Sequence, residues 1–211
     1  MADFSSIKKL FGITNPKGLS SDEINSIKSI FGNLPQTLID FYMEFGNEPE
    51  VTQTQDSLLL PNDLKYFKHN EYLIFYCENQ RVCVWGIHKD DLAKENPLVY
   101  MSYDEKEWMP ESEKLSDFLL AMSYLQSLFA LEYIVDTFRY ISAGDVEYIR
   151  SNFKSKGVSF KQWTQGIEFY SNYDDSIIII MGGGEQLMYS SASKEHFTEM
   201  DKVLSTLGEE M

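Results

Sequence analysis

The 211-residue chain is poor in cysteine, the residue that stabilises many small secreted domains. Its only two cysteines, Cys77 and Cys83, have a spacing that matches neither a zinc site nor a redox motif. This excludes a disulfide framework and predicts free, buried thiols in a reducing compartment. If the two residues lie on paired strands of a tight hairpin, they face opposite sides of the sheet and are not bonded.

Long apolar runs are missing as well. The longest apolar stretch without a charge is Phe118–Leu131, which has 14 residues, whereas a membrane span needs about 20. Residues 1–19 contain no apolar segment of the kind that secretory signals have. The sequence therefore predicts a cytoplasmic protein with no membrane association, in which residues 118–131 belong to a buried helix.

Basic residues are scarce compared with acidic ones. The chain has 18 Lys and Arg against 33 Asp and Glu, which gives a formal net charge of -15. The excess is spread out, because residues 1–131 carry 11 basic and 20 acidic residues and residues 132–211 carry 7 and 13. Such a field repels a phosphate backbone and attracts a basic protein, so we expect no direct nucleic-acid binding. Solubility alone is the other interpretation of this charge.

The usual signatures of a catalytic or metal site are also absent. The three histidines, His69, His88 and His196, are far apart, stand in polar surroundings and lack metal-ligand spacing, so we expect them at the surface. No Gly-x-Ser-x-Gly motif occurs. The run Gly182–Gly184 precedes a predicted strand and lacks the Lys-Ser/Thr of a phosphate loop, so it predicts a hairpin turn. We expect a non-enzyme without a metal or a cofactor.

One segment concentrates acidic residues around an aromatic side chain, and we take it as the candidate partner-binding site. Its members are Asp104, Glu105, Glu107, Trp108, Glu111 and Glu113. The segment is predicted to be a solvated loop, where paired carboxylates lack the burial that acid–base catalysis needs. It is either a charged surface alone or a docking surface for a basic partner. Trp108 is either a lid on the core or an interface anchor, because tryptophan is common in binding hot spots.

Helical patterns dominate the beginning of the chain. Residues 1–19 are only weakly patterned, and we expect a loosely attached arm there. Ser20 and Glu23 have the spacing of a capping box, which predicts a helix that ends at Gly32. A second helix is expected to begin at Pro35, where the missing N–H of proline costs nothing.

The remainder mixes strands and helices. Strands are expected at residues 57–60, 72–77, 81–87, 98–101, 167–170, 176–181 and 186–190. Helical segments are expected at residues 62–69, 116–142, 143–153 and 193–207. The runs 72–77 and 81–87 are apolar on both faces, so we expect them to be adjacent and central, with Trp85 in the core and Gly86 leaving room for a neighbour. The sequence thus predicts one α+β domain over residues 1–211, an antiparallel twisted sheet with helices packed mainly on one side.

Four stretches, taken in order, resemble a known family. They are Asp22–Phe31 with Leu34-Pro35 and Phe41-Tyr42-x-x-Phe45-Gly46-Asn47; Leu60-Pro61 with the following helical turn; Phe75-Tyr76-Cys77-Glu78-Asn79-Gln80 with Val84-Trp85-Gly86-Ile87; and Asn96-Pro97-x-Val99-Tyr100 with Trp108 and Leu115–Leu120. Their order and spacing resemble the SUKH superfamily, which includes the yeast Smi/Knr regulators of cell-wall assembly and many bacterial immunity proteins. Arg81 departs from this pattern, because a small residue such as Gly is common there.

The resemblance covers about residues 20–131 and implies a SUKH-like core, with an extension over about residues 132–211 that adds strands and a final helix. It implies a non-enzymatic binding protein, because bacterial members neutralise a cognate toxin by direct binding. These toxins are often nucleases, and a basic toxin domain suits an acidic inhibitor. The alternative is a regulatory or scaffold module of the same fold with no toxin partner. The sequence does not specify an oligomeric state.

Overall fold

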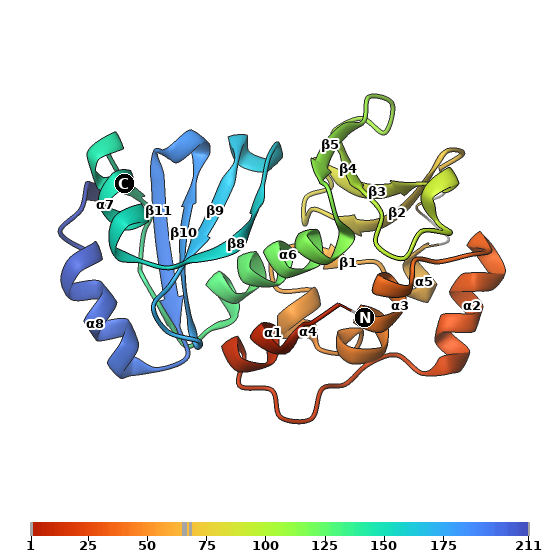
Figure 1. Ribbon diagram of the computed structural model, residues 1–211, viewed down its shortest axis with the longest axis horizontal. Helices are drawn as coiled ribbons and strands as arrows, with labels where there is room; N and C mark the ends of the chain where they lie inside the picture. The colour runs from red at the N-terminus through yellow and green to blue at the C-terminus, as the bar shows by residue number, and fades with distance from the viewer. Residues whose placement is uncertain (1, 65–66, 68, 211) are drawn as a thin grey trace.

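The computed structural model describes residues 2–64, 67 and 69–210 and places two antiparallel sheets on opposite sides of one long helix (Figure 1). That helix is α6 (Leu115–Ala130), and nearly all of its side chains from Phe118 to Leu128 are buried. Helix and sheets together confirm the predicted α+β class. Within the described residues, none of the helices has the length and apolar character needed to cross a bilayer.

The N-terminal sheet is a meander of five strands that pair in chain order. They are β1 (Ser57–Leu58), β2 (Tyr72–Cys77), β3 (Val84–His88), β4 (Val99–Ser102) and β5 (Met109–Ser112). β2 and β3 pair with each other and each has a further strand on its other side, which confirms the adjacent interior pair that the sequence predicts. Tyr76 and Trp85 pack on Phe118 of α6, with ring centroids 5.9 and 5.8 Å apart, so this face of the sheet is the core face.

Cys77 and Cys83 are free and buried, as the sequence predicts. Cys77 pairs with Val84 in the register of β2 and β3, so Cys83, which precedes Val84, faces the other side of the sheet. Burial raises the pKa of the Cys77 thiol to about 11, and it also raises that of Cys83. Both side chains therefore stay in the unreactive thiol form at neutral pH.

The C-terminal sheet has the strand order β12-β7-β11-β10-β9-β8, and β6 also pairs with β11. The strands are β6 (Tyr133–Ile134), β7 (Arg139–Tyr140), β8 (Ser155–Phe160), β9 (Ile167–Tyr170), β10 (Ser176–Met181), β11 (Gln186–Ser191) and β12 (Glu209–Glu210). β9, β10 and β11 confirm the three strands expected here, within one residue. Gly182, Gly183 and Gly184 all have positive φ and connect β10 to β11, which confirms the predicted hairpin turn.

Two sheets replace the single sheet that the sequence predicts, because α6 packs between the two groups of strands. This helix is also shorter than expected. α6 ends at Ala130 instead of Ser142, and Leu131 is already extended. The chain then crosses to the second sheet, where Ile134 and Phe138 pack against the core as extended chain. An apolar run can be buried as either helix or strand, so the pattern alone did not reveal this change.

The expected loose arm at residues 1–19 is wrong. This segment contains α1 (Ser5–Leu10), and Phe4, Ile7 and Leu10 are buried in the core. The ring of Phe4 lies edge-on to that of Phe41, with centroids 5.2 Å apart. A helix of 6 residues has too few apolar side chains to show a helical hydrophobic period in the sequence. Its apolar side chains are nevertheless buried.

The other helices agree with the sequence pattern, apart from the short helix at Pro49–Thr52, which the sequence does not predict. They are α2 (Ser21–Phe31), α3 (Gln36–Phe45), α4 (Pro49–Thr52), α5 (Pro61–Leu64), α7 (Ala143–Asn152) and α8 (Lys194–Leu204). The capping box of α2 is present, because Ser20 and Glu23 each accept the other's backbone N–H, and Gly32 ends the helix with φ of 79°. α5 forms the start of the helical segment expected at residues 62–69, in which Lys65, Tyr66 and Lys68 lie outside the described residues.

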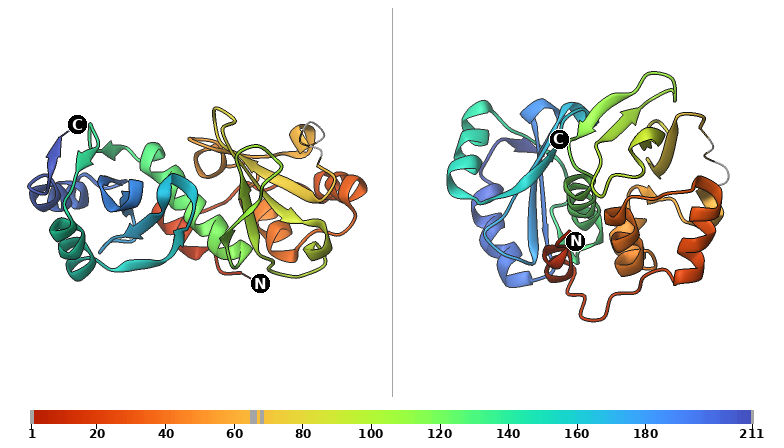
Figure 2. Two further views of the ribbon diagram at one scale, coloured as in Figure 1. Left: turned by 90° about the horizontal axis from the view of Figure 1, so that it is seen from above. Right: turned by 45° about the vertical axis from the view of Figure 1, so that its right-hand side comes forward.

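Helices cover the two sheets differently. Figure 1 shows α1, α3, α4 and α6 on one side of the N-terminal sheet, as predicted. The C-terminal sheet is covered on both faces (Figure 2): Ile177 and Ile179 of β10 join the core around α6, whereas Ile178 and Ile180 pack with α7 and α8. The alternation of side chains along a strand explains this division.

A buried amide on α6 anchors the segment that precedes β1. Gln126 Oε1 accepts the backbone N–H groups of Gln55 and Asp56, at 2.5 and 3.4 Å, and its Nε2 donates to the Asp56 carbonyl at 2.5 Å. The Asp56 carboxylate accepts the N–H of Asn79 through Oδ1, whereas its buried Oδ2 has no hydrogen-bond partner among the described residues. Burial raises the pKa of Asp56 to about 7, and the nearby charge of Glu78 adds to this. The ionised carboxylate therefore destabilises the fold.

Asp56→Asn is expected to be more stable than the wild type above pH 7. The folded-state pKa of about 7 lies above the ordinary value of 3.8, so the folded protein binds the extra proton and loses stability as pH rises through this window. The difference in free energy of unfolding between the variant and the wild type should grow from about pH 4 to about pH 7, by on the order of 4 kcal/mol at most, and then stay constant. Urea unfolding of both proteins across this range measures it, and a difference that does not change with pH contradicts the prediction.

Candidate protein-binding surface

The face of the N-terminal sheet that points away from α6, here called the outer face, carries a cluster of aromatic rings. Side chains alternate along β3, so Trp85 enters the core and Gly86 and His88 lie on the outer face. Tyr72 lies opposite His88 in the register of β2 and β3. Its ring centroid is 5.1 Å from that of His88 and 5.5 Å from that of Tyr100.

Trp108 lies flat across this cluster. Its ring stacks on Tyr72 with centroids 3.9 Å apart and planes within 11°. A Cβ atom at position 86 would lie 3.0 Å from the Trp108 ring, so glycine leaves the space that the ring occupies, which confirms the expected close neighbour. Trp108 is half-buried, so it covers the sheet and still presents part of its ring to solvent.

Residues 103–107, here called the acidic loop, connect β4 to β5 and are ordered by their own contacts. Asp104 Oδ1 accepts the backbone N–H groups of Lys106 and Glu107, both at 2.9 Å. The N–H groups of Glu107 and Lys106 hold the pKa of Asp104 below its ordinary value. Glu105 adopts a left-handed conformation with φ of 59°. The side chains of Glu105 and Glu107 are exposed, so the loop presents two carboxylates beside the tryptophan.

Glu111 does not belong to this surface, contrary to the sequence interpretation. It lies in β5, is fully buried, and its carboxylate accepts the backbone N–H groups of Lys161, Gln162 and Trp163 at 2.5, 3.0 and 3.1 Å. Burial raises its pKa, and the three N–H groups partly offset that effect. Glu111 thus joins β5 to the β8–β9 turn of the other sheet. Glu113 is exposed as expected, and it pairs with Lys161 at 3.0 Å.

The histidines are not the scattered surface residues that the sequence predicts. The rings of His69 and His88 both lie against Tyr72, at centroid distances of 5.5 and 5.1 Å, and both are half-buried. His196 is also half-buried, and its Nδ1 contacts the Asp175 carboxylate at 2.7 Å. His69 and His88 are far apart in the sequence, but the strand meander brings both to the outer face of the N-terminal sheet.

The aromatic cluster is not apparent from the sequence, because its members come from separate segments that meet only in the folded sheet. One local signal is present in β3. Val84, Gly86 and His88 occupy alternate positions that become less apolar towards the strand end, which indicates one face open to solvent or to a loop. The pairing of β3 with β4 and the path of the acidic loop cannot be read from that signal.

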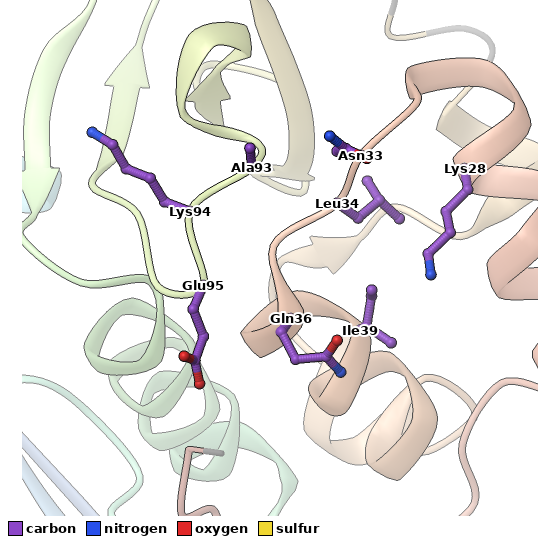
Figure 3. Close-up of a pocket in the computed structure, with 8 residues that line it drawn as sticks. All are labelled: Lys28, Asn33, Leu34, Gln36, Ile39, Ala93, Lys94 and Glu95. Atoms are coloured by element: carbon purple, nitrogen blue, oxygen red, sulfur yellow. The ribbon is translucent and has the colours of Figure 1, made fainter.

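Two hollows lie near α2. The larger, of about 550 Å³, lies between the α2–α3 connection and residues 93–95. Figure 3 shows Lys28 and Gln36 reaching towards the apolar side chains of Leu34 and Ile39, whereas Lys94 extends away. Its lining among the described residues combines two lysines and one glutamate with amide and apolar side chains.

The smaller hollow, of about 370 Å³, adjoins the aromatic cluster and is lined by Ile30, Phe31, His69, Asn70 and Lys89. His69 lines this hollow and also contacts the Trp108 ring and the Glu105 carbonyl, so we treat the acidic loop, the tryptophan and the hollow as one candidate surface. Among the described residues, no group of three or more His, Cys, Asp or Glu side chains is arranged to hold a metal ion.

Comparison of the chain with protein-family models, with curated proteins and with solved structures found no match. The resemblance to the SUKH superfamily therefore rests on the order and spacing of its sequence motifs. Family membership stays a prediction, and the function has to be argued from the surface itself.

Glu111→Ala is expected to destabilise the protein strongly, whereas Glu113→Ala should have little effect. The first change leaves three partly buried N–H groups without their acceptor and empties a buried position, which together cost about 2–3 kcal/mol. The second removes only an exposed ion pair, which contributes less than about 1 kcal/mol. Urea unfolding of both variants measures the difference. Equal losses would show that Glu111 does not join the two sheets.

Proposed function

We propose that this protein is a non-enzymatic binding protein of the immunity type, which neutralises a basic toxin domain by binding it directly. The observation that carries the proposal is the pair of exposed carboxylates, Glu105 and Glu107, held beside the half-buried ring of Trp108. Tryptophan is among the residues that most often form binding hot spots, and the rim around such residues is polar. The two free cysteines fit a reducing compartment such as the cytoplasm.

Electrostatics support a basic partner. The net charge of -15 creates a long-range field that attracts positive surfaces and speeds encounter. An acidic inhibitor suits a basic nuclease in particular, because the groove that binds phosphate also attracts carboxylates. The family resemblance points to the same kind of partner, since bacterial SUKH-like proteins include many immunity proteins.

The order of the acidic loop supports a preformed surface. Asp104 is occupied inside the loop, where it fixes the backbone, so we assign direct contact to Glu105, Glu107 and Trp108 and a rim position to Glu113. Tyr103, which is 55% exposed, joins this group. A loop that is already ordered loses little conformational entropy on binding, and this favours affinity.

Reversal of charge at the acidic loop is expected to slow association. The double variant Glu105→Lys/Glu107→Lys should associate at least about tenfold more slowly than the wild type with the product of the adjacent gene, and the dependence on salt should weaken. The matched control is Asp136→Lys/Glu185→Lys, which changes the net charge equally at exposed positions in the C-terminal half. Surface binding kinetics at several salt concentrations measure both. Equal effects in the two variants would assign the attraction to net charge alone.

Trp108→Ala is expected to act mainly on dissociation. Loss of a hot-spot ring should raise the dissociation rate about 30-fold, which corresponds to about 2 kcal/mol. Tyr140→Ala provides the control, because Tyr140 is a 49% exposed aromatic residue on β7 of the other sheet. Unfolding of the free Trp108→Ala variant is measured in parallel, since the ring also covers Gly86. An unchanged dissociation rate would remove Trp108 from the interface.

A pull-down with the product of the adjacent gene decides between the proposal and its alternative. Capture of a toxin domain that is inactivated by the protein supports the immunity function. A neighbouring gene that encodes no toxin, together with the absence of any inhibition, favours a regulatory or scaffold role.

A further inference from the structure

The acidic loop is tied to the rest of the sheet through one carbonyl group. The backbone oxygen of Glu105 lies 2.9 Å from His69 Nε2 and 3.3 Å from Trp108 Nε1. Among the described residues, the contact with His69 is the hydrogen bond that links the loop to a segment outside its own hairpin. His69 precedes β2, so this bond spans 36 positions of the chain.

The contacts of the second ring nitrogen of His69 determine the tautomer of its neutral ring. His69 Nδ1 lies 3.1 Å from the backbone nitrogens of Glu71 and of Tyr72. A backbone N–H can only donate, so Nδ1 has to accept and cannot carry a proton. The proton of the neutral ring is therefore on Nε2, where it is donated to the Glu105 carbonyl.

We propose that His69 is a pH-dependent latch for the acidic loop. When the ring gains a second proton, its Nδ1–H points at two N–H donors, and this repulsion moves the ring away from the position where Nε2 reaches Glu105. The loop then loses its link to the segment that precedes β2, and Trp108 loses its ring contact with His69. The part of this inference that concerns the partner rests on the proposed function: the partner binds at neutral pH and is released in acid.

The surroundings of His69 allow this change to occur. Its ring contacts Tyr72 and Trp108, at centroid distances of 5.5 and 5.4 Å, and it is half-buried, so water can reach it. Among the described residues, the charged or titratable ones on the segments packed against it are Glu71 on its own segment, Asp104, Glu105 and Glu107 on the acidic loop, Tyr72 and His88 on the outer face, and Lys89 at the adjoining hollow.

Residue-level hydrogen exchange on the free protein tests the latch. At about pH 5, relative to about pH 7.5 and after correction for intrinsic rates, the backbone amides of Glu71 and Tyr72 and the Trp108 indole N–H should lose at least about tenfold protection. The amide of Trp85, inside the sheet, should not change. His69→Gln, an uncharged side chain with one acceptor and one donor, should remove the pH dependence, and His88→Gln should keep it.

A second measurement uses the wild type alone. The NMR signal of the Trp108 indole should shift along the same titration curve as the His69 ring, and the neutral ring should carry its proton on Nε2. The latch is overturned if the Trp108 signal does not follow His69, or if exchange at Glu71 and Tyr72 is equal at both pH values. It is also overturned if His69→Gln responds to acid as the wild type does.

Binding experiments separate the latch from the proposed function. The wild type should dissociate from the adjacent gene product at least about tenfold faster at about pH 5 than at about pH 7.5, whereas His69→Gln should dissociate at similar rates. If the wild type dissociates at equal rates at the two pH values while hydrogen exchange shows that the loop is released in acid, the regulatory role is overturned. Absence of binding at both pH values overturns the proposed function, while the exchange data still decide the latch.

Discussion

The architecture depends on one helix, α6, which is buried by elements on more than one of its sides. α6 has an apolar surface too wide for a single sheet to cover, since nearly every side chain from Phe118 to Leu128 is buried. The N-terminal helices and sheet cover one side and the C-terminal sheet covers the other (Figure 1). Because apolar burial is the main favourable contribution to folding, the C-terminal sheet shares its core with the N-terminal half.

Two buried polar residues make that arrangement specific. Gln126 satisfies the backbone groups around Asp56, and Glu111 satisfies the N–H groups of the β8–β9 turn. Apolar contacts allow many relative positions of two sheets, whereas a buried acceptor facing three N–H groups allows few. Glu111 belongs to the acidic segment by sequence, but it stabilises the junction of the sheets instead of meeting a partner.

The candidate surface lies on the N-terminal sheet, whose two faces are covered differently. The core face of the N-terminal sheet is covered by helices, whereas the ring of Trp108 covers the middle of its outer face. Trp108 can lie there because Gly86 has no side chain, and the stacked Tyr72 supports it. An aromatic ring held in place beside Glu105 and Glu107 is chemically suited to a basic protein surface. The hydrogen bond from His69 to the Glu105 carbonyl makes the position of the acidic loop depend on the protonation of one imidazole ring.

Local chemistry allowed much of the secondary structure to be predicted from the sequence. The capping box at Ser20, the glycine turn at Gly182–Gly184 and the doubly apolar β2 and β3 each depend on neighbouring residues, and each forms as expected. The net charge, the two unbonded thiols and the close approach at Gly86 likewise follow from residue types alone. Only the tertiary structure decided that α6 stops at Ala130, that residues 1–19 are packed, that Glu111 is buried and that His69 meets Glu105. These outcomes depend on contacts between segments far apart in the chain, and a hydrophobic pattern shows that a side chain is buried but not what covers it.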